Sequence, residues 1–174
     1  LDANIHPYWK CVVDDYLGII YLNSRVMEKS KEHFFRVLHR AEDMKDIKSI
    51  AYAYSHISTY YHVNNQLDSA LFYATNILKH EKEVDSTILA AVYHNLANIQ
   101  RKIATSQDNQ ILNNLKLSKS FKINPRVSLI TDALFAQFYY SNGIMDSAKQ
   151  YHTRVTEGEN DIACLVLYNF LADY

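Results

Sequence analysis

Residues 51–80 read AYAYSHISTYYHVNNQLDSALFYATNILKH. In the first half of this segment, Tyr54, Ile57, Ser58 and Tyr61 lie three, one and three residues apart, which places them on one face of an α-helix. The segment contains neither glycine nor proline, so no helix-breaking residue interrupts this pattern. The first half therefore predicts a helix that buries one aromatic and aliphatic face.

The second half of the segment predicts another helix. Ala70, Tyr73 and Ile77 recur at three- and four-residue steps, and Asn64-Asn65 before them suit the left-handed end of the preceding helix. Asn65 also suits the cap position of the second helix. Where two antiparallel helices cross, a large side chain at the closest approach would push them apart, so a small residue is required there. The segment therefore predicts a helical hairpin.

The pairing of a large residue with a small one recurs through the whole chain. It occurs at Leu17-Gly18, Ile57-Ser58, Leu96-Ala97, Phe135-Ala136 and Leu171-Ala172, at steps of 40, 39, 39 and 36 residues. In three of the four complete copies, a tyrosine lies four positions after the large residue. A repeat of this length predicts a solenoid in which each hairpin packs on its neighbours.

These positions resemble the signature of the tetratricopeptide repeat family. The residues at the signature positions of that family are Tyr54, Ile57, Ser58, Tyr61, Ala70, Ala74 and Ile77. The steps are longer than the usual repeat of about 34 residues, as in the long-loop variant of the family. The resemblance covers nearly all of residues 12–174 and implies an all-α fold, a right-handed superhelix of antiparallel helix pairs.

The resemblance also implies a single solenoid over residues 1–174, with four hairpins and one further helix. The expected boundaries are 8–45, 48–84, 86–125 and 127–158 for the hairpins, and 160–174 for the last helix. The third hairpin departs from the pattern by four extra residues around Ala104 to Gln110, for which we expect a longer first helix or a longer loop. In the same hairpin, Asn113 replaces the usual small residue.

The expected last helix is apolar for the end of a solenoid. Its apolar residues include Cys164, Leu165, Val166, Leu167, Phe170 and Leu171. Terminal repeats usually carry a polar outer face, so we expect the chain to be a fragment of a longer protein in which more repeats or another domain follow. If the chain ends at Tyr174, we expect this helix to pair with its copy in a twofold dimer.

Composition excludes several classes of protein. Glycine numbers 3 and proline 2 among the 174 residues, too few for the turns of sandwiches, barrels and doubly wound sheets or for phosphate-binding loops. The formal net charge of −1 does not favour nucleic acid as a partner. The longest apolar run, Ala163 to Tyr168, is far shorter than the roughly 20 residues of a membrane-spanning helix, so we expect no membrane insertion. The residues do not indicate a compartment.

The sequence contains no recognisable catalytic or metal-binding motif. Ligand histidines on one helix face lie three or four residues apart, whereas His56 and His62 are six apart. Cys11 and Cys164 lie in apolar contexts, and we interpret them as small buried residues. We therefore expect no metal, no cofactor and no enzymatic activity. Strongly shifted pKa values around a pocket at His56, His62 and His94 would instead favour an enzyme.

The resemblance implies a concave peptide-binding groove along the first helices of the hairpins. Four positions around each large residue line it, namely Asp15, Tyr16, Ile19, Leu22, Ser55, His56, Thr59, His62, His94, Asn95, Asn98, Arg101, Ala133, Leu134, Gln137 and Tyr140. The candidate binding residues among them are His56, Thr59, His62, His94, Asn95, Asn98, Arg101, Gln137 and Tyr140. For Tyr52 and Tyr140, which lie on the groove face outside the repeat core, ligand binding and simple exposure are equally good interpretations.

The middle of the implied groove is polar and carries positive charge. Asn98 occupies the position at which peptide-clamping members of the family hold the backbone of a ligand, and Arg101 and Lys102 lie close to it in sequence. An acidic or carboxylate-ended peptide would suit such a patch. His94 stands where those members use lysine, which argues against a C-terminal carboxylate clamp. A solvated polar face is the alternative interpretation of these residues.

The sequence thus leads to two hypotheses about function. In the first, the chain is a non-enzymatic protein-interaction module that binds a peptide or helix of a partner in its concave groove. In the second, it is the sensory or regulatory segment of a larger signalling protein, such as a transcription regulator. Fold alone does not separate these hypotheses, because one fold serves many functions.

Overall fold

The computed structural model describes residues 6–103, 107–121, 125–158 and 161–172. Within these ranges the chain forms nine α-helices and no β-strand. The helices are α1 (Pro7–Asn23), α2 (Met27–Met44), α3 (Ile47–Val63), α4 (Leu67–Leu78), α5 (Ser86–Lys102), α6 (Asp108–Ser120), α7 (Pro125–Ser141), α8 (Met145–Glu157) and α9 (Asp161–Ala172). The predicted all-α class is confirmed.

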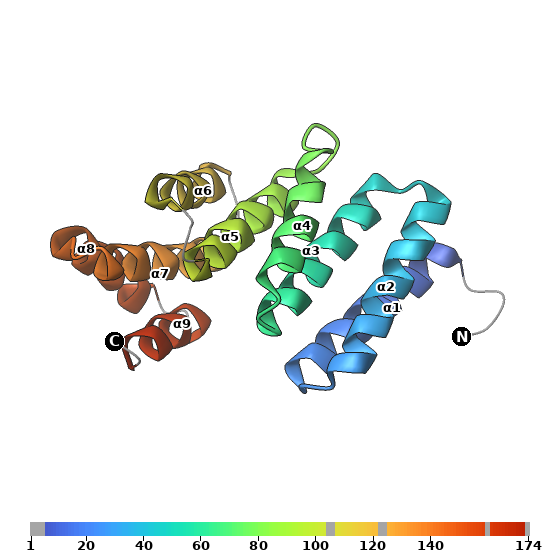
Figure 1. Ribbon diagram of the computed structural model, residues 1–174, viewed down its shortest axis with the longest axis horizontal. Helices are drawn as coiled ribbons and strands as arrows, with labels where there is room; N and C mark the ends of the chain where they lie inside the picture. Colours follow the sequence, from blue (N-terminus) through green and yellow to red (C-terminus); the bar gives the residue numbers. More distant parts are fainter. Residues whose placement is uncertain (1–5, 104–106, 122–124, 159–160, 173–174) are drawn as a thin grey trace.

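Helices that are adjacent in sequence pack against each other along the whole chain (Figure 1). The hairpins are α1 with α2, α3 with α4, α5 with α6, and α7 with α8. The second helix of each of the first three hairpins also packs on the first helix of the next, so that α2 covers α3, α4 covers α5 and α6 covers α7. This consecutive packing of helix pairs is compatible with a helical repeat.

The stack bends around its odd-numbered helices. Helix α1 contacts α3, α3 contacts α5, and α5 contacts α7, whereas the described residues of α2, α4, α6 and α8 make no such contacts with one another. The first helices of the hairpins therefore form a continuous inner layer, and the second helices spread apart on the outer side. We call the surface of α1, α3, α5 and α7 that lies away from the even-numbered helices the inner face.

Small residues bring the helices of a hairpin together, as the crossing argument predicts. In the first hairpin, Ser30 Oγ donates a hydrogen bond to the carbonyl oxygen of Gly18 at 3.0 Å. In the second, Ser58 Oγ donates to the carbonyl oxygen of Ala70 at 2.8 Å. A short serine side chain reaches the backbone of the facing helix only where the two backbones approach closely. These contacts mark the crossing points of the two hairpins.

Gly18→Val is expected to destabilise the first hairpin. A Cβ atom at Gly18 would lie 2.4 Å from Cε1 of Phe34, whose ring is fully buried. Overpacking a buried contact costs about 1–3 kcal/mol, which urea unfolding would measure as a lower free energy of unfolding. The control is a double-mutant cycle with Phe34→Leu. An equal cost of Gly18→Val in the Phe34 and Leu backgrounds would contradict this explanation.

The third hairpin has a longer link between its helices than the other hairpins, and its first helix is not lengthened. Helix α5 has 17 residues, as do α1, α3 and α7, and residues 103–107 separate it from α6. Of these, residues 104–106 lie outside the described ranges. Asn113 is exposed, and the buried Ser118 instead donates to the carbonyl oxygen of Ala90 at 2.9 Å. A small residue therefore joins this hairpin at a different position.

Left-handed residues end the first helices of three hairpins. Asn65 has a φ of 58° and Gly143 a φ of 70°, while Arg25 takes a φ of 59° at the corresponding place in the first hairpin. The left-handed conformation predicted for Asn65 is confirmed. The prediction that Asn65 caps the following helix is wrong, because Gln66 occupies that cap position and its side chain forms no capping hydrogen bond.

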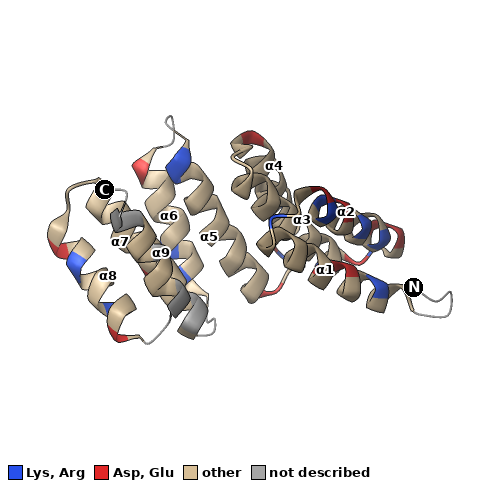
Figure 2. Ribbon diagram, turned by 90° about the horizontal axis from the view of Figure 1, so that it is seen from below, with Lys and Arg blue, Asp and Glu red and all other residues tan. Residues whose placement is uncertain are grey.

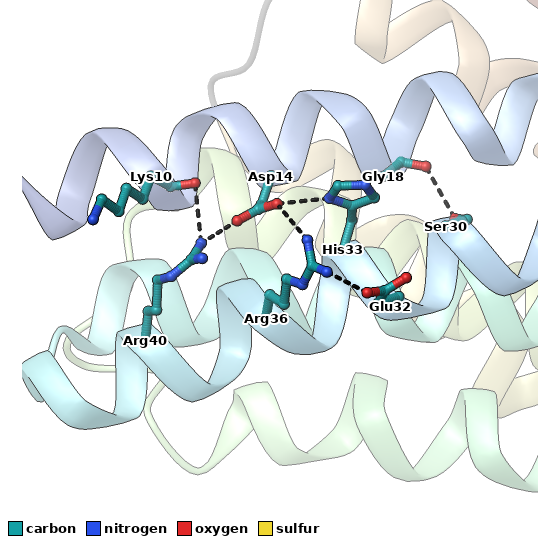
Figure 3. Close-up of polar contacts among 8 residues, drawn as sticks. All are labelled: Lys10, Asp14, Gly18, Ser30, Glu32, His33, Arg36 and Arg40. Atoms are coloured by element: carbon teal, nitrogen blue, oxygen red, sulfur yellow. Dashed lines mark hydrogen bonds and ion pairs between the residues drawn. The ribbon is translucent and has the colours of Figure 1, made fainter. Parts of the chain in front are cut away.

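A buried ion cluster joins α1 to α2 (Figure 3). Asp14 is 1% exposed, its carboxylate lies 2.6 Å from His33 Nδ1, and it accepts a hydrogen bond from Arg40. Arg36 Nη1 lies 3.8 Å from the same carboxylate. Burial acts to raise the pKa of Asp14, but the hydrogen bonds with Arg40 and His33 outweigh burial and lower the pKa from its ordinary value of 3.8. The carboxylate therefore remains charged inside the hairpin.

The last helix, α9, packs on the preceding hairpin. Ala163 and Leu167 are buried and pack with residues of α7 and α8, while Leu165 and Tyr168 are exposed. Other residues of the predicted apolar surface have side chains outside the described part of the chain, namely Val166, Phe170 and Leu171. Among the described residues, no helix combines the length and the apolar character needed to cross a membrane.

Candidate functional site

Polar side chains link neighbouring helices of the inner layer. Asn95 Nδ2 on α5 donates a hydrogen bond to Thr59 Oγ1 on α3 at 3.4 Å. His94 Nδ1 on α5 lies within hydrogen-bond distance, 3.1 Å, of Thr131 Oγ1 on α7. Three of the predicted binding residues, Thr59, His94 and Asn95, therefore have partners within the chain.

A hollow of about 390 Å³ lies between α1 and α3. We call it the N-terminal hollow, and its lining residues are Tyr8, Cys11, Val12, Asp15, Tyr16, Val37, Lys48, Ser49 and Tyr52. Tyr8, Tyr16 and Tyr52 are exposed, so three aromatic side chains are available to a ligand. The volume lies within the range of about 300–1,000 Å³ that is usual for ligand-binding clefts.

The charged groups of the N-terminal hollow are paired within the chain. Asp15 Oδ1 lies 2.5 Å from Nδ1 of His56, whose ring stacks on the buried ring of Phe34. Lys48 Nζ lies 3.1 Å from Asp85 Oδ2, and the hydrogen bond with this carboxylate raises the pKa of Lys48. The predicted residue His56 thus orients a wall of the hollow. What the hollow offers a ligand is mainly aromatic surface.

The cysteines differ in their burial. Cys11, which lines the N-terminal hollow, is 3% exposed, and its Sγ lies 4.0 Å from the carbonyl oxygen of Val37. Burial raises the pKa of the Cys11 thiol, which disfavours the nucleophilic thiolate. This agrees with the interpretation of Cys11 as a small buried residue. Cys164 is only partly buried, with its Sγ 3.6 Å from the carbonyl oxygen of Val155.

A second group of residues gathers where α3 adjoins α5. We call His62, His94, Arg101 and Lys102 the basic cluster. Burial, together with the positive charges of Lys102 and Arg101, lowers the pKa of His62 to about 4. Burial and the neighbouring His62 lower the pKa of His94 to about 4, and burial lowers the pKa of Arg101. In α5 the charged residues are confined to the C-terminal end (Figure 2). The structure thus brings three predicted binding residues together.

The space beside His62 is very small. His62 Nε2 is buried and has no hydrogen-bond partner among the described groups. A cavity of about 10 Å³ next to it is lined by Ser58, Thr59, His62, Asn95 and Ile99. Roughly one water molecule fits such a volume, and a substrate does not. The lowered pKa values of the two histidines therefore follow from burial and nearby charge, and they do not identify a catalytic pocket.

The other predicted residues lie in different environments. Gln137 is buried in α7, and Tyr140 is half-buried against the residues that pack α7 on α9. Asn98 is half-buried on α5. Arg101 also lines a hollow of about 310 Å³ formed by the end of α5, the start of α6 and the end of α7. The nine predicted residues therefore do not form one uninterrupted surface.

The prediction missed Tyr8 and Lys48 as lining residues of the N-terminal hollow. These two residues occupy equivalent positions, nine residues before Leu17 and Ile57. The predicted groove began two positions before each large residue, so it left out the first turns of α1 and α3. The 40-residue step that relates Tyr8 to Lys48 was the available signal. It places both residues at the same end of neighbouring helices.

Within the part of the chain that the structure describes, no group of three or more His, Cys, Asp or Glu side chains is placed to hold a metal ion. Comparisons with protein-family models, with curated proteins and with solved structures found no match to the chain. The function must therefore be inferred from the geometry of the helices and of their inner face.

Proposed function

We propose that the chain is a non-enzymatic protein-interaction module of the tetratricopeptide type, a right-handed superhelix whose inner face binds a peptide or helix of a partner. The observation that carries this proposal is the N-terminal hollow, where Tyr8, Tyr16 and Tyr52 leave aromatic surface exposed beside an open volume. Tyrosine is enriched at binding hot spots because its ring buries a large area while its hydroxyl forms hydrogen bonds. An apolar side chain of the partner enters this hollow.

The pairing of charges around the hollow determines how it recognises a ligand. Because Asp15 is engaged by His56, and Lys48 by Asp85, the ligand does not have to neutralise a buried charge there. Burial of apolar and aromatic surface supplies the binding energy at this end. Binding at the hollow is therefore expected to depend weakly on ionic strength.

The basic cluster lies further along the same surface and offers a ligand positive charge, whereas the N-terminal hollow offers aromatic surface. Arg101 and Lys102 place positive charge at the C-terminal end of α5, further along the inner layer. A carboxylate forms strong charge-assisted hydrogen bonds with such groups. We therefore expect the ligand to combine an apolar residue for the N-terminal hollow with an acidic residue nearer to α5.

Three observations support binding without catalysis. In the Asp15–His56 pair, the Asp15 carboxylate orients the His56 ring as in a catalytic histidine–carboxylate pair. The His56 ring, however, is stacked on the buried ring of Phe34. The nearby Cys11 has a raised pKa, which keeps its thiol protonated. The cavity next to His62 is too small for a substrate. None of these groups is arranged to act on a bound molecule.

The proposal predicts that selection from a displayed random-peptide library will yield sequences that share an apolar residue and an acidic residue. Binding of a selected peptide is then measured by calorimetry to the unchanged chain and to a Tyr8→Ser, Tyr52→Ser variant. Loss of two hot-spot aromatics is expected to weaken binding by at least about tenfold. Both side chains are partly exposed, so their replacement should leave the fold intact.

The matched control is Phe72→Ser, which removes an exposed aromatic ring from α4 in the outer layer. This variant is expected to bind the selected peptides as the unchanged chain does. If no common sequence is enriched, or if the peptides bind equally well to the double tyrosine variant, the inner face is not the binding surface and the proposal is wrong.

A further inference from the structure

Helix α1 carries an apolar stripe that the rest of the structure leaves uncovered. Trp9, Val13, Tyr16 and Ile20 are spaced four, three and four residues apart, so they lie on one face of the helix. Trp9 is 59%, Val13 39% and Ile20 56% exposed, and Tyr16 is also exposed. A stripe with this spacing is typical of a helix face that packs against another helix. We call these four residues the end stripe.

Two of these four repeat positions, those of Val13 and Ile20, are buried on the later odd-numbered helices. The position of Val13, four residues before the large residue, is occupied by Ala53, Val92, Thr131 and Leu167, each at most 1% exposed. The position of Ile20, three residues after the large residue, is occupied by Tyr60, Ile99 and Phe138, which are all buried. The repeat therefore uses these positions as a packing surface, and α1 alone among the described helices leaves them exposed.

At the first three junctions the covering element is the second helix of the preceding hairpin. Helix α4 packs on α5, and its buried residues Ala70, Ala74 and Ile77, which lie four and three residues apart, belong to one cluster with Ile88 and Val92. Helices α2 and α6 cover α3 and α7 in the same order. Helix α2 contributes Phe34, Val37 and Leu38 to its cluster with α3, so the packing surface accepts an apolar helix face with helical spacing.

We infer that the end stripe is a docking surface for an amphipathic helix with the apolar spacing of α4. The cluster that α4 shares with α5 contains Val92 and Ile99, which are the repeat equivalents of the exposed Val13 and Ile20 of α1. The docked helix extends the stack by one element beyond α1. This surface meets the N-terminal hollow at Tyr16, whereas Trp9, Val13 and Ile20 do not line that hollow.

The sizes of the side chains favour a helix of this kind over a second copy of the chain. In the cluster that α4 shares with α5, α4 contributes the small Ala74 and the aliphatic Ile77. If α1 packed against α1 of a second copy, the bulky Trp9 and Tyr16 side chains would instead meet the same bulky side chains of the other copy. Among the described residues, the stripes of α2, α4 and α6 are already covered by the following hairpin. None of these three helices is therefore free in a second copy to take this place.

Trp9 gives a direct readout, because the chain has a single tryptophan. The probe is a chain in which residues 64–85 are repeated and joined directly to Pro7. Pro7 precedes Leu17 by the same ten residues that separate Ser86 from Leu96, so the added helix meets α1 as α4 meets α5. Proline is well tolerated at the first position of a helix, so the junction does not disturb α1.

The added helix is expected to shift the Trp9 emission to shorter wavelength and to lower its quenching by iodide. It is also expected to raise the melting temperature by a few degrees, about 2–4 °C for each kcal/mol gained. The matched control carries Ala74→Asp and Ile77→Asp in the added segment alone and should leave Trp9 as accessible as in the unmodified chain. A Val13→Ser, Ile20→Ser change in α1 should abolish the protection of Trp9 from iodide that the added helix gives. Circular dichroism checks that the helicity of this variant is unchanged.

Two results would overturn the inference. One is equal quenching of Trp9 with the intact added helix and with its aspartate control, in chains of equal helicity. The other is protection of Trp9 in the unmodified chain that grows with concentration together with a doubling of mass in sedimentation, which would make a second copy the occupant. Peptide binding in the N-terminal hollow is measured separately, because Trp9, Val13 and Ile20 do not line that hollow.

Discussion

Asp14→Ala is expected to lower the free energy of unfolding by about 3–5 kcal/mol, because removal of one partner leaves buried charge uncompensated. The Asp14 carboxylate is buried between α1 and α2, where it contacts His33 and Arg40 and lies near Arg36 (Figure 3). In the variant, the mostly buried His33 ring and the Arg40 guanidinium lose their shared acceptor. Urea unfolding followed by circular dichroism at neutral pH measures the loss.

The control for this prediction is Glu32→Ala. Glu32 pairs with Arg36 across one turn of α2, and both side chains are well exposed. Such a surface pair is worth about 0–1 kcal/mol, so its removal should hardly change the unfolding midpoint. If Asp14→Ala costs no more than Glu32→Ala, the buried cluster does not stabilise the first hairpin and the explanation is wrong.

The hairpins of this chain could be predicted because their cause is local. Gly18 and Ser58 are small so that two helices can approach, and the apolar residues beside them keep helical spacing. Each hairpin thus depends on a segment of about 40 residues, as the repeat steps indicate. The bend of the stack depends on how each hairpin rotates on the next. Hydrophobic spacing does not fix that rotation, so the spread of the even-numbered helices was visible only in the structure.

The candidate site was harder to predict, because a polar residue on the inner side of a helix can contact either a ligand or the neighbouring helix. Asn95 and Thr59 were both predicted to face a ligand, yet they form a hydrogen bond with each other across 36 residues of sequence. His94 likewise meets Thr131 of the next hairpin. A residue that contacts a ligand and one that contacts the neighbouring helix have the same spacing in the sequence.

The ion cluster at Asp14 shows which signal was available but unused. Successive residues of a helix point about 100° apart, so the adjacent Asp14 and Asp15 face α2 and α3 respectively. On α2, His33, Arg36 and Arg40 are spaced three and four residues apart and share one face. A basic stripe on the second helix of a hairpin therefore indicates a carboxylate on the first helix.

Lowering the pH from about 7.5 to about 5 is expected to reduce the free energy of unfolding by about 2 kcal/mol through the buried His94, and by less through His62, which solvent screens in part. In the folded protein, burial and nearby charge lower both pKa values from 6.5 to about 4. In the unfolded chain the rings protonate near 6.5, so between the two values the unfolded state binds more protons. The stabilisation is therefore complete above about pH 6.5 and is lost as the pH falls towards 4.

A His62→Gln, His94→Gln variant tests this assignment, because glutamine keeps hydrogen-bonding groups at both positions but does not titrate. Urea unfolding from about pH 7.5 down to about pH 5 should give a flatter stability profile for the variant than for the unchanged chain. Asp14 and Asp85, whose pKa values are lowered from 3.8, titrate below this window and do not contribute to the difference. Parallel profiles for the two proteins would show that neither ring is held neutral by the fold. A profile that flattens would establish that the basic cluster keeps its histidines uncharged at neutral pH, which leaves Arg101 and Lys102 to supply the positive charge that an acidic ligand meets.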